Sequence, residues 1–236
     1  MSDVVICAVA RTPIGRYRGA LADRSAVELG IHAVKGLLAR ANIDPTSGIV
    51  DEVLFGQVLQ AGAGQAPARQ VALGSLKAVM MAANSIRAGE YNVIVAGGME
   101  SMTNAPYFGK KISKTEFGEM KPTMIHDGLW DVYNNEHMGN TGETVSDEFD
   151  IDRGTADSFS TRSHNLAQAA WNQGWMEFEV IDTPGLDIDE GIRPGSDLSE
   201  MKAVFKDGGK ITAGNASQLS DGAAAVLVAN RQVAEE

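Results

Sequence analysis

The sequence has almost no cysteine and no long hydrophobic run. Cys7 is the only cysteine among 236 residues, which excludes an internal disulfide and a zinc site built from cysteines within the chain. No stretch approaches the roughly 18 apolar residues that read as a membrane-spanning helix. The first residues also lack the basic segment and apolar core of a signal peptide. We therefore expect no membrane segment, and we expect the cytoplasm as the location.

Basic residues are also scarce relative to acidic ones. The chain has 20 Lys and Arg against 31 Asp and Glu, a formal net charge of −11. A surface with this balance repels a phosphate backbone on average, so nucleic acid is not an expected partner. The balance does not exclude a small anionic ligand, because a local cluster of donors is enough to hold one.

Strand and helix signals alternate in the first part of the chain. Residues 4–9 form an apolar run, and 50–58 returns to strand character after an amphipathic helix. Ser25 and Glu28 have the spacing of a capping box at the start of that helix. A strand, a helix and a strand at this spacing predict the α/β fold class, with a parallel sheet and right-handed crossovers.

The next segment continues the alternation. Residues 65–74 predict a short helix that ends at a glycine, and 76–87 predict a helix that is apolar nearly all the way round and must be covered on both sides. A buried strand follows at 91–96 and ends at Gly97 and Gly98. This glycine pair lacks the spacing of a dinucleotide-binding loop, so we interpret it as tight packing at a strand end.

The later part of the chain contains one clear amphipathic helix and a last strand. Asp152 is placed to cap the helix, whose inner face is expected to hold Phe159, Leu166 and Ala170. Sheet character resumes at 222–229.

Residues 104–210 differ in amino-acid composition from the rest of the chain. They hold all three tryptophans and three of the four histidines, with many turn formers and mixed charge. We expect an inserted subdomain at 104–210, carried by an α/β domain formed from 1–103 and 211–236.

Seven short motifs occur in order and are spread along most of the chain. They lie at 11–15 (Arg-Thr-Pro-Ile-Gly), 64–70 (Gly-Gln-Ala-Pro-Ala-Arg-Gln), 86–90 (Ile-Arg-Ala-Gly-Glu), 96–102 (Ala-Gly-Gly-Met-Glu-Ser-Met), 135–139 (Asn-Glu-His-Met-Gly), 212–217 (Thr-Ala-Gly-Asn-Ala-Ser) and 221–224 (Asp-Gly-Ala-Ala). Each alone is weak. Together they resemble the N-terminal and loop domains of thiolases of the acetyl-CoA acetyltransferase type.

The resemblance implies a fold and a reaction. It implies the N-terminal half of a five-layered α-β-α-β-α architecture with an inserted loop subdomain. It also implies an acyl-CoA thioester as substrate, no separate cofactor or metal, and a homo-oligomer. The family reaction is the condensation of two acetyl-CoA molecules, or the thiolysis of a 3-oxoacyl-CoA.

The sequence departs from the family where the nucleophile should be. In the family, a strand and a Val-Cys-Gly-Ser turn precede the helix predicted here at 76–87, and that cysteine carries the acyl group. Here Gly74 joins directly to Ser75, so this strand and its cysteine are absent. Cys7 lies in an apolar strand, where we expect a buried thiol with a raised pKa rather than a nucleophile.

Other family features are also absent. The Asn-Glu-Ala-Phe and Gly-His-Pro segments and a second cysteine do not occur. The stretch between Arg193 and Phe205 is somewhat shorter than in the family. We therefore assign no catalytic residue to this chain.

The resemblance still implies binding residues. Arg193 matches a residue near the phosphate end of coenzyme A, and a solvated surface arginine is the alternative. Ser217 matches a serine that contacts the pantetheine arm, and a serine in a small-residue turn is the alternative. His137 and Met138 match residues that line the acyl pocket. The last members of the expected set, as apolar walls of the same groove, are Phe205 and Ala213.

Three functional hypotheses follow. The first is a thiolase-family acetyltransferase whose present chain is truncated and inactive alone. The second is a degenerate thiolase that binds acyl-CoA or a partner without chemistry. The third is an unstable fragment, because an uncovered apolar helix favours association and a strand lost from mid-sheet leaves unpaired backbone groups.

Overall fold

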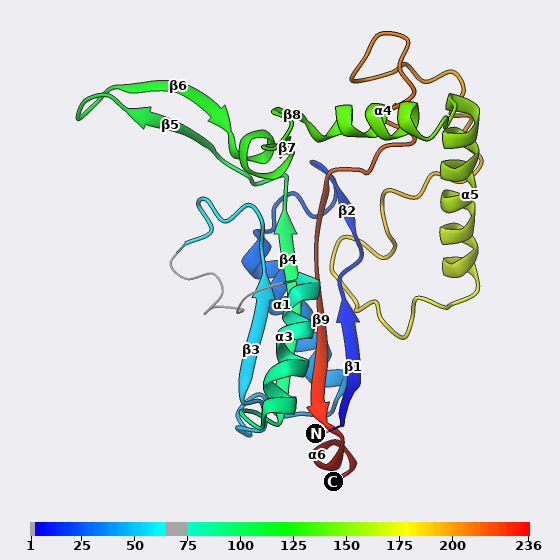
Figure 1. Ribbon diagram of the computed structural model, residues 1–236. Helices are drawn as coiled ribbons and strands as arrows, with labels where there is room; N and C mark the ends of the chain where they lie inside the picture. The colour runs from blue at the N-terminus through cyan, green and yellow to red at the C-terminus, as the bar shows by residue number, and fades with distance from the viewer. Residues whose placement is uncertain (1–2, 65–74) are drawn as a thin grey trace. The chain divides into compact units, whose positions relative to one another are not determined.

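A computed structural model describes residues 3–64 and 75–236 (Figure 1). The chain divides into two compact units. The first contains Met1–Asn104, Met176–Glu190 and Ser220–Glu236, and the second contains Ala105–Trp175 and Gly191–Leu219. The inserted subdomain at the boundaries given above stays a prediction.

The first unit is a sheet with helices. Its elements are β1 (Val4–Arg11), β2 (Gly15–Arg16), α1 (Ala26–Arg40), β3 (Glu52–Gly56), α3 (Ser75–Ala88), β4 (Val93–Ser101), β9 (Ser220–Asn230) and α6 (Arg231–Glu235). The four predicted strands and the helices after Ser25 and at 76–87 are confirmed, with ends shifted by a few residues. The short helix predicted at 65–74 lies outside the described residues.

The sheet is mixed rather than parallel. Its order is β1-β9-β4-β3, with β2 pairing on β9 (Figure 1). Strand β3 is parallel to β4, whereas β9 runs antiparallel to both β1 and β4. The expectation of an all-parallel sheet is therefore wrong for β9, which enters the sheet after a long excursion of the chain and not after a crossover helix. Pairing is continuous from β3 to β1, so the expected gap in mid-sheet is also wrong.

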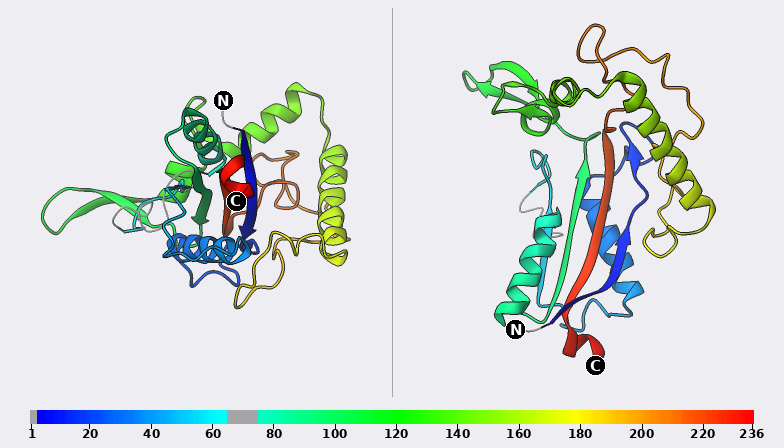
Figure 2. Two further views of the ribbon diagram at one scale, coloured as in Figure 1. Left: turned by 90° about the horizontal axis from the view of Figure 1, so that it is seen from below. Right: turned by 45° about the vertical axis from the view of Figure 1, so that its right-hand side comes forward.

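Side chains alternate between the two faces of the sheet. In β4, Val93 and Val95 belong to the cluster that packs on α1, whereas Ile94 and Ala96 belong to the cluster that packs on α3. Strand β9 repeats this alternation. A strand buried on both faces needs apolar residues at successive positions, which explains the continuous apolar runs in the sequence. Figure 2 shows α1 and α3 on opposite sides of the sheet.

Helix α1 begins with the predicted capping box. The Ser25 hydroxyl accepts from the Glu28 backbone N–H at 3.2 Å, and the Glu28 carboxylate accepts from the Ser25 N–H at 2.8 Å. These bonds satisfy two of the free N–H groups of the first turn. The Ser25 backbone N–H lowers the pKa of Glu28, because the bond favours the charged carboxylate.

Helix α3 has one buried face and one exposed face. Ala78, Ala82 and Ile86 are fully buried against the sheet. On the outer face, Leu76 is 78% exposed and Met80 is 55% exposed. The expectation that the helix is covered on both sides is thus met on one side only within the described residues.

The glycine pair at 97 and 98 lies inside β4 and not at its end. A Cβ atom built on Gly97 would lie 2.2 Å from the Ala224 carbonyl oxygen and 2.5 Å from the Phe55 ring. A side chain there would therefore force β4 away from its neighbours. The interpretation as tight backbone packing is confirmed, and the predicted position at a strand end is wrong because pairing with β9 continues through Ser101.

A buried carboxylate lies where the chain leaves the sheet and returns to it. Asp221 of β9 is fully buried and pairs in register with Ser101 of β4. It accepts hydrogen bonds from the Ser101 hydroxyl at 3.1 Å, the Thr103 N–H at 3.0 Å and the Thr103 hydroxyl at 2.5 Å. Three donors of this kind compensate for the removal of a charge from water.

The second unit is built from short strands and two helices. Its elements are β5 (Tyr107–Lys111), β6 (Phe117–Pro122), a one-turn π-helix (Met124–Gly128), β7 (Trp130–Asp131), β8 (Glu136–His137), α4 (Met138–Glu148) and α5 (Arg153–Asn172). The predicted cap of α5 is confirmed, since the Asp152 carboxylate accepts from the Thr155 N–H at 2.6 Å. The predicted inner face is wrong: Phe159 and Leu166 are exposed, and only Ala170 is buried. The buried side of α5 instead carries Asp157, so polar bonds to loops take the place of an apolar stripe.

No helix within 3–64 or 75–236 combines the length and the apolar character that a bilayer crossing needs.

The two faces of α3 should respond differently to truncation. Ile86→Ala removes a fully buried side chain and should lower the free energy of unfolding by about 2–5 kcal/mol. Met80→Ala on the exposed face of the same helix should change it by less than about 0.5 kcal/mol. Urea unfolding followed by circular dichroism measures both. Equal losses would show that the outer face is also covered in solution.

Candidate functional site

All six residues of the expected binding set lie in the second unit. His137 ends β8 and caps α4, because its Nδ1 atom accepts from the Gly139 N–H at 3.0 Å. Strand β7 fixes this position through the pairing of Trp130 with His137. Nδ1 thus serves as the acceptor that a helix start needs, and this bond fixes the plane of the ring.

Phe205 lies on the histidine. The two rings are stacked, with centroids 5.0 Å apart and planes 27° from parallel. A Cβ atom at position 139 would lie 2.2 Å from the Phe205 ring, so the ring rests on the Gly139 backbone. Met138 is adjacent and half exposed. The structure therefore brings Phe205 against His137 and Gly139, next to Met138, and the acyl-pocket role of these residues stays a prediction.

Arg193 contacts the turn at 212–217, which carries Ala213 and Ser217. Its Nη2 atom donates to the Ala213 carbonyl at 3.0 Å, and its backbone N–H donates to His164 Nδ1 at 3.3 Å. A guanidinium group has five N–H donors, and this bond uses one of them. Arg193 and Ala213 are thus neighbours, and among residues 3–64 and 75–236 no partner takes the other guanidinium donors, which leaves them for an anion.

The turn at 212–217 is closed by its own polar groups. The Thr212 hydroxyl accepts from the Gly214 N–H at 3.1 Å, and the Thr212 carbonyl accepts from the Ala216 N–H at 2.9 Å. Thr212 and Gly214 are buried, whereas Ala213 and Ser217 are exposed. Among the contacts of the described residues, none joins Ser217 to His137 or the other predicted residues.

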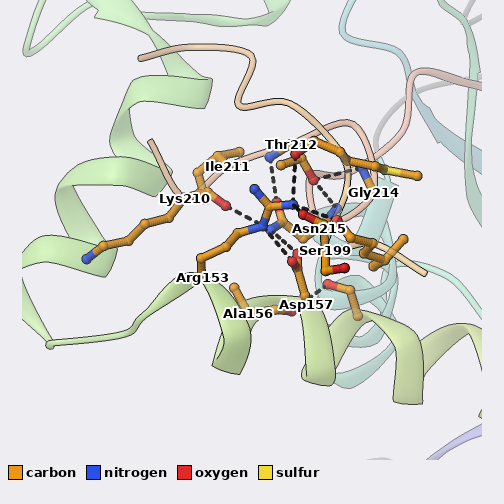
Figure 3. Close-up of polar contacts among 12 residues, drawn as sticks. Arg153, Ala156, Asp157, Ser199, Lys210, Ile211, Thr212, Gly214 and Asn215 are labelled. Atoms are coloured by element: carbon orange, nitrogen blue, oxygen red, sulfur yellow. Dashed lines mark hydrogen bonds and ion pairs between the residues drawn. The ribbon is translucent and has the colours of Figure 1, made fainter. Parts of the chain in front are cut away.

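Sequence reasoning missed the residues that hold this turn (Figure 3). The Asp157 carboxylate accepts from Asn215 Nδ2 at 2.8 Å and from Arg153 Nε at 2.5 Å. Arg153 Nη2 also donates to the carbonyls of Leu198 at 2.6 Å and Met201 at 2.9 Å. The only sequence signal was the i,i+4 spacing of Arg153 and Asp157, which is typical of a surface ion pair and does not identify a buried one.

A second missed carboxylate fixes the start of the turn. Glu143 of α4 is buried, and it accepts from the backbone N–H groups of Lys210 at 2.8 Å and Ile211 at 2.9 Å. The Lys210 ammonium lies 2.9 Å from Asp147. Hydrogen bonds from Lys210 and Lys206 lower the pKa of Asp147. Helix α4 therefore carries His137 at one end and anchors the turn further along.

Cys7 is exposed, so the prediction of a buried thiol is wrong. The pairing of β1 with β9 shifts register between Ile6 and Ala8, and Cys7 occupies this bulge. The predicted direction of its pKa is nevertheless confirmed, because partial desolvation raises the pKa of the Cys7 thiol. The guanidinium beside it, on Arg40, donates to the carbonyls of Glu177, Phe178 and Val180. A thiol in mid-strand lacks the helix start that lowers a cysteine pKa.

A groove of the second unit lies elsewhere. It measures about 710 Å³ and runs between α5 and residues 196–199. None of the six predicted binding residues lines it, although Asp157 does. Residues 3–64 and 75–236 contain no cluster of three or more His, Cys, Asp or Glu that could hold a metal ion.

Comparisons with known proteins connect this arrangement to one family. The family described as "Thiolase, N-terminal domain" matches residues 4–75 and 70–232. The chain is 42% identical to the acetyl-CoA acetyltransferase of Cupriavidus necator, with 100% of the chain and 68% of that protein covered. It is 40% identical to acetyl-CoA acetyltransferase 2 of Arabidopsis thaliana, with 98% and 66% covered. The chain thus spans about two thirds of the length of these relatives.

Two solved structures are similar throughout the chain. One is human mitochondrial 3-ketoacyl-CoA thiolase in complex with CoA, with a TM-score of 0.91 and 28% identity, covering 99% of this chain and 66% of that one. The other is a thiolase from Ascaris suum in complex with coenzyme A, with a TM-score of 0.91 and 31% identity, covering 99% and 67%. The thiolase-like α/β fold predicted from the motifs is confirmed.

The reactivity of Cys7 can be checked directly. Because desolvation raises its pKa, the thiol should react with iodoacetamide several-fold more slowly at pH 7 than N-acetylcysteine does, despite its exposure. The pH at which the rate reaches half of its maximum should lie above that of N-acetylcysteine in the same buffer. Mass spectrometry of timed samples measures both values. A midpoint below the reference would mean that a nearby group stabilises the thiolate.

Proposed function

The chain belongs to the thiolase family, and on that premise we propose that it provides the coenzyme A-binding part of an acetyl-CoA C-acetyltransferase without catalysing the reaction by itself. The reaction proposed for the complete enzyme is the condensation of two acetyl-CoA molecules, or its reverse, the thiolysis of a 3-oxoacyl-CoA. The substrate is a coenzyme A thioester, and no separate cofactor takes part.

The observation that carries the binding proposal is the junction of Arg193 with the turn at 212–217. The guanidinium donates to the Ala213 carbonyl, and Ala213 and Ser217 of the same turn are exposed. A guanidinium with free donors suits a phosphate, and a hydroxyl suits the amides of a pantetheine arm. Two similar thiolases were crystallised with coenzyme A, which supports this ligand class.

The stack of His137 and Phe205 supports an acyl pocket. Met138 adds a flexible apolar side chain next to the two rings, and such a surface suits a short acyl group.

The alternative function is a degenerate thiolase that holds acyl-CoA without chemistry. It requires the same pocket and differs only in whether a complete enzyme is ever formed.

The proposal that the chain is inactive depends on its single thiol, Cys7. Acyl transfer begins when a thiolate attacks the thioester carbonyl, forms an enzyme thioester and releases coenzyme A. The thiolate must be stable near neutral pH, and Cys7 has neither a lowered pKa nor a helix start beside it. We also propose a cytoplasmic homo-oligomer, and the exposed apolar face of α3 supports self-association.

Turnover should be undetectable in the pure chain. Incubation with acetoacetyl-CoA and free CoA should leave the enolate absorbance constant over hours, because no activated thiolate is present. A full-length acetyl-CoA acetyltransferase serves as the positive control. Turnover that Cys7→Ser abolishes would identify Cys7 as a nucleophile and overturn this part of the proposal.

Binding of coenzyme A should be measurable by titration calorimetry. Arg193→Ala should weaken it roughly tenfold, since a bond to a charged group contributes about 1.5–3 kcal/mol, and Ser217→Ala should weaken it several-fold. Arg162→Ala is the matched control. Arg162 is exposed on α5, so its replacement removes the same charge at a place away from the turn. Equal weakening by the control would indicate a general charge effect. The absence of heat at millimolar CoA would reject the binding site.

A further inference from the structure

We infer that Asp157 is a positioning residue for coenzyme A binding, because its charge sets the conformation of the turn at 212–217. This inference rests on the proposed function, since it assigns a role to a residue behind the proposed contacts. Asp157 is largely buried, and its Oδ1 atom is bonded to Asn215, so we expect it to act through the turn and not by direct contact.

Asp157 is held rigidly before it meets the turn. It lies in the second turn of α5, whose first turn is capped by Asp152. Its Oδ2 atom accepts from Arg153 Nε at 2.5 Å, which leaves Oδ1 to face the turn. An ionised carboxylate only accepts hydrogen bonds. The group that faces Oδ1 must therefore be a donor.

This requirement fixes the amide of Asn215. Its Nδ2 atom donates to Asp157 Oδ1 at 2.8 Å and to the Lys210 carbonyl at 2.9 Å. Since the amide nitrogen faces the carboxylate, the amide oxygen faces the other way and accepts from the Thr212 N–H at 2.8 Å. A rotated amide would place two acceptors against each other at Asp157. One charge thus selects one orientation and closes the turn (Figure 3).

The same ion pair supports the turn from its other side. Arg153 donates to the carbonyls of Leu198 and Met201. A Cβ atom on Gly214 would lie 2.6 Å from Met201 Sδ and 2.8 Å from Leu198 Cδ2, so the turn rests on these two side chains. Arg153 and Asp157 therefore fix both the support of the turn and its internal bond, which together determine where Ala213 and Ser217 are presented.

The test compares two acidic residues of one helix. Asp157→Asn keeps the size but offers Asn215 either a donor or an acceptor, so the turn loses its single conformation. Asp152→Ala removes the cap of α5 and lowers stability without touching the turn. Calorimetric titration with CoA, below the melting temperature of both variants, should show roughly tenfold weaker binding for Asp157→Asn and less than about twofold change for Asp152→Ala.

An exchange of the two side chains provides a rescue. In the double variant Asp157→Asn with Asn215→Asp, the new amide donates to the new carboxylate, which still accepts from the Thr212 N–H. Arg153 still finds an oxygen acceptor at 157. Because the new carboxylate cannot donate to the Lys210 carbonyl, the double variant should recover only part of the lost affinity. The ¹⁵N-labelled amide signals of Gly214 and Ser217 should shift back toward their wild-type response to CoA.

The outcomes separate this inference from the proposed function. Suppose that the wild-type chain binds CoA. If Asp157→Asn then leaves the affinity unchanged, or if Asp152→Ala weakens it equally, the inference is overturned and the proposed function stands. Failure of the double variant to recover affinity would also count against it. No binding by the wild-type chain would reject the proposed function, and the inference with it.

Discussion

The buried carboxylate of Asp221 is the interaction on which the register of the first unit's sheet depends. It joins the end of β4 to the start of β9 through Ser101 and Thr103, at the point where the chain leaves the first unit and returns to it. Without these three hydrogen-bond donors, the Asp221 carboxylate would be a buried charge with no compensating partner. The bonds therefore keep β9 in register between β4 and β1, and the sheet depends on that register.

The elements of the sheet could be predicted because their signals are local. A few adjacent residues are enough to identify the apolar runs of β1 and β9 and the capping box at Ser25. The direction of β9 was not predictable from such signals, since strand direction depends on where the chain re-enters the sheet. The prediction that Cys7 is buried was wrong for a related reason. Cys7 lies at a bulge, and a bulge arises from pairing with a strand that is distant in sequence.

Some residues of the candidate site could likewise be predicted from local signals, and others could not. His137, Met138 and Arg193 were found through short motifs that resemble a family. Asp157 and Asn215 were not, because each looks ordinary in sequence and gains its role only when α5 meets a turn nearly sixty residues later. Apolar periodicity also misassigned the inner face of α5, where Phe159 is exposed and a polar network takes the place of an apolar core.

The pairing of β1 with β9 has a consequence for the synthesis of the chain. Val4 at the start of the sequence pairs with Asn230 near its end, and β9 is the neighbour of both β1 and β4. The emerging polypeptide therefore leaves β1 and one edge of β4 unpaired on the ribosome until residues 220–230 have been translated. High contact order of this kind slows folding and prolongs the exposure of apolar strands, which makes the nascent chain a natural client for chaperones.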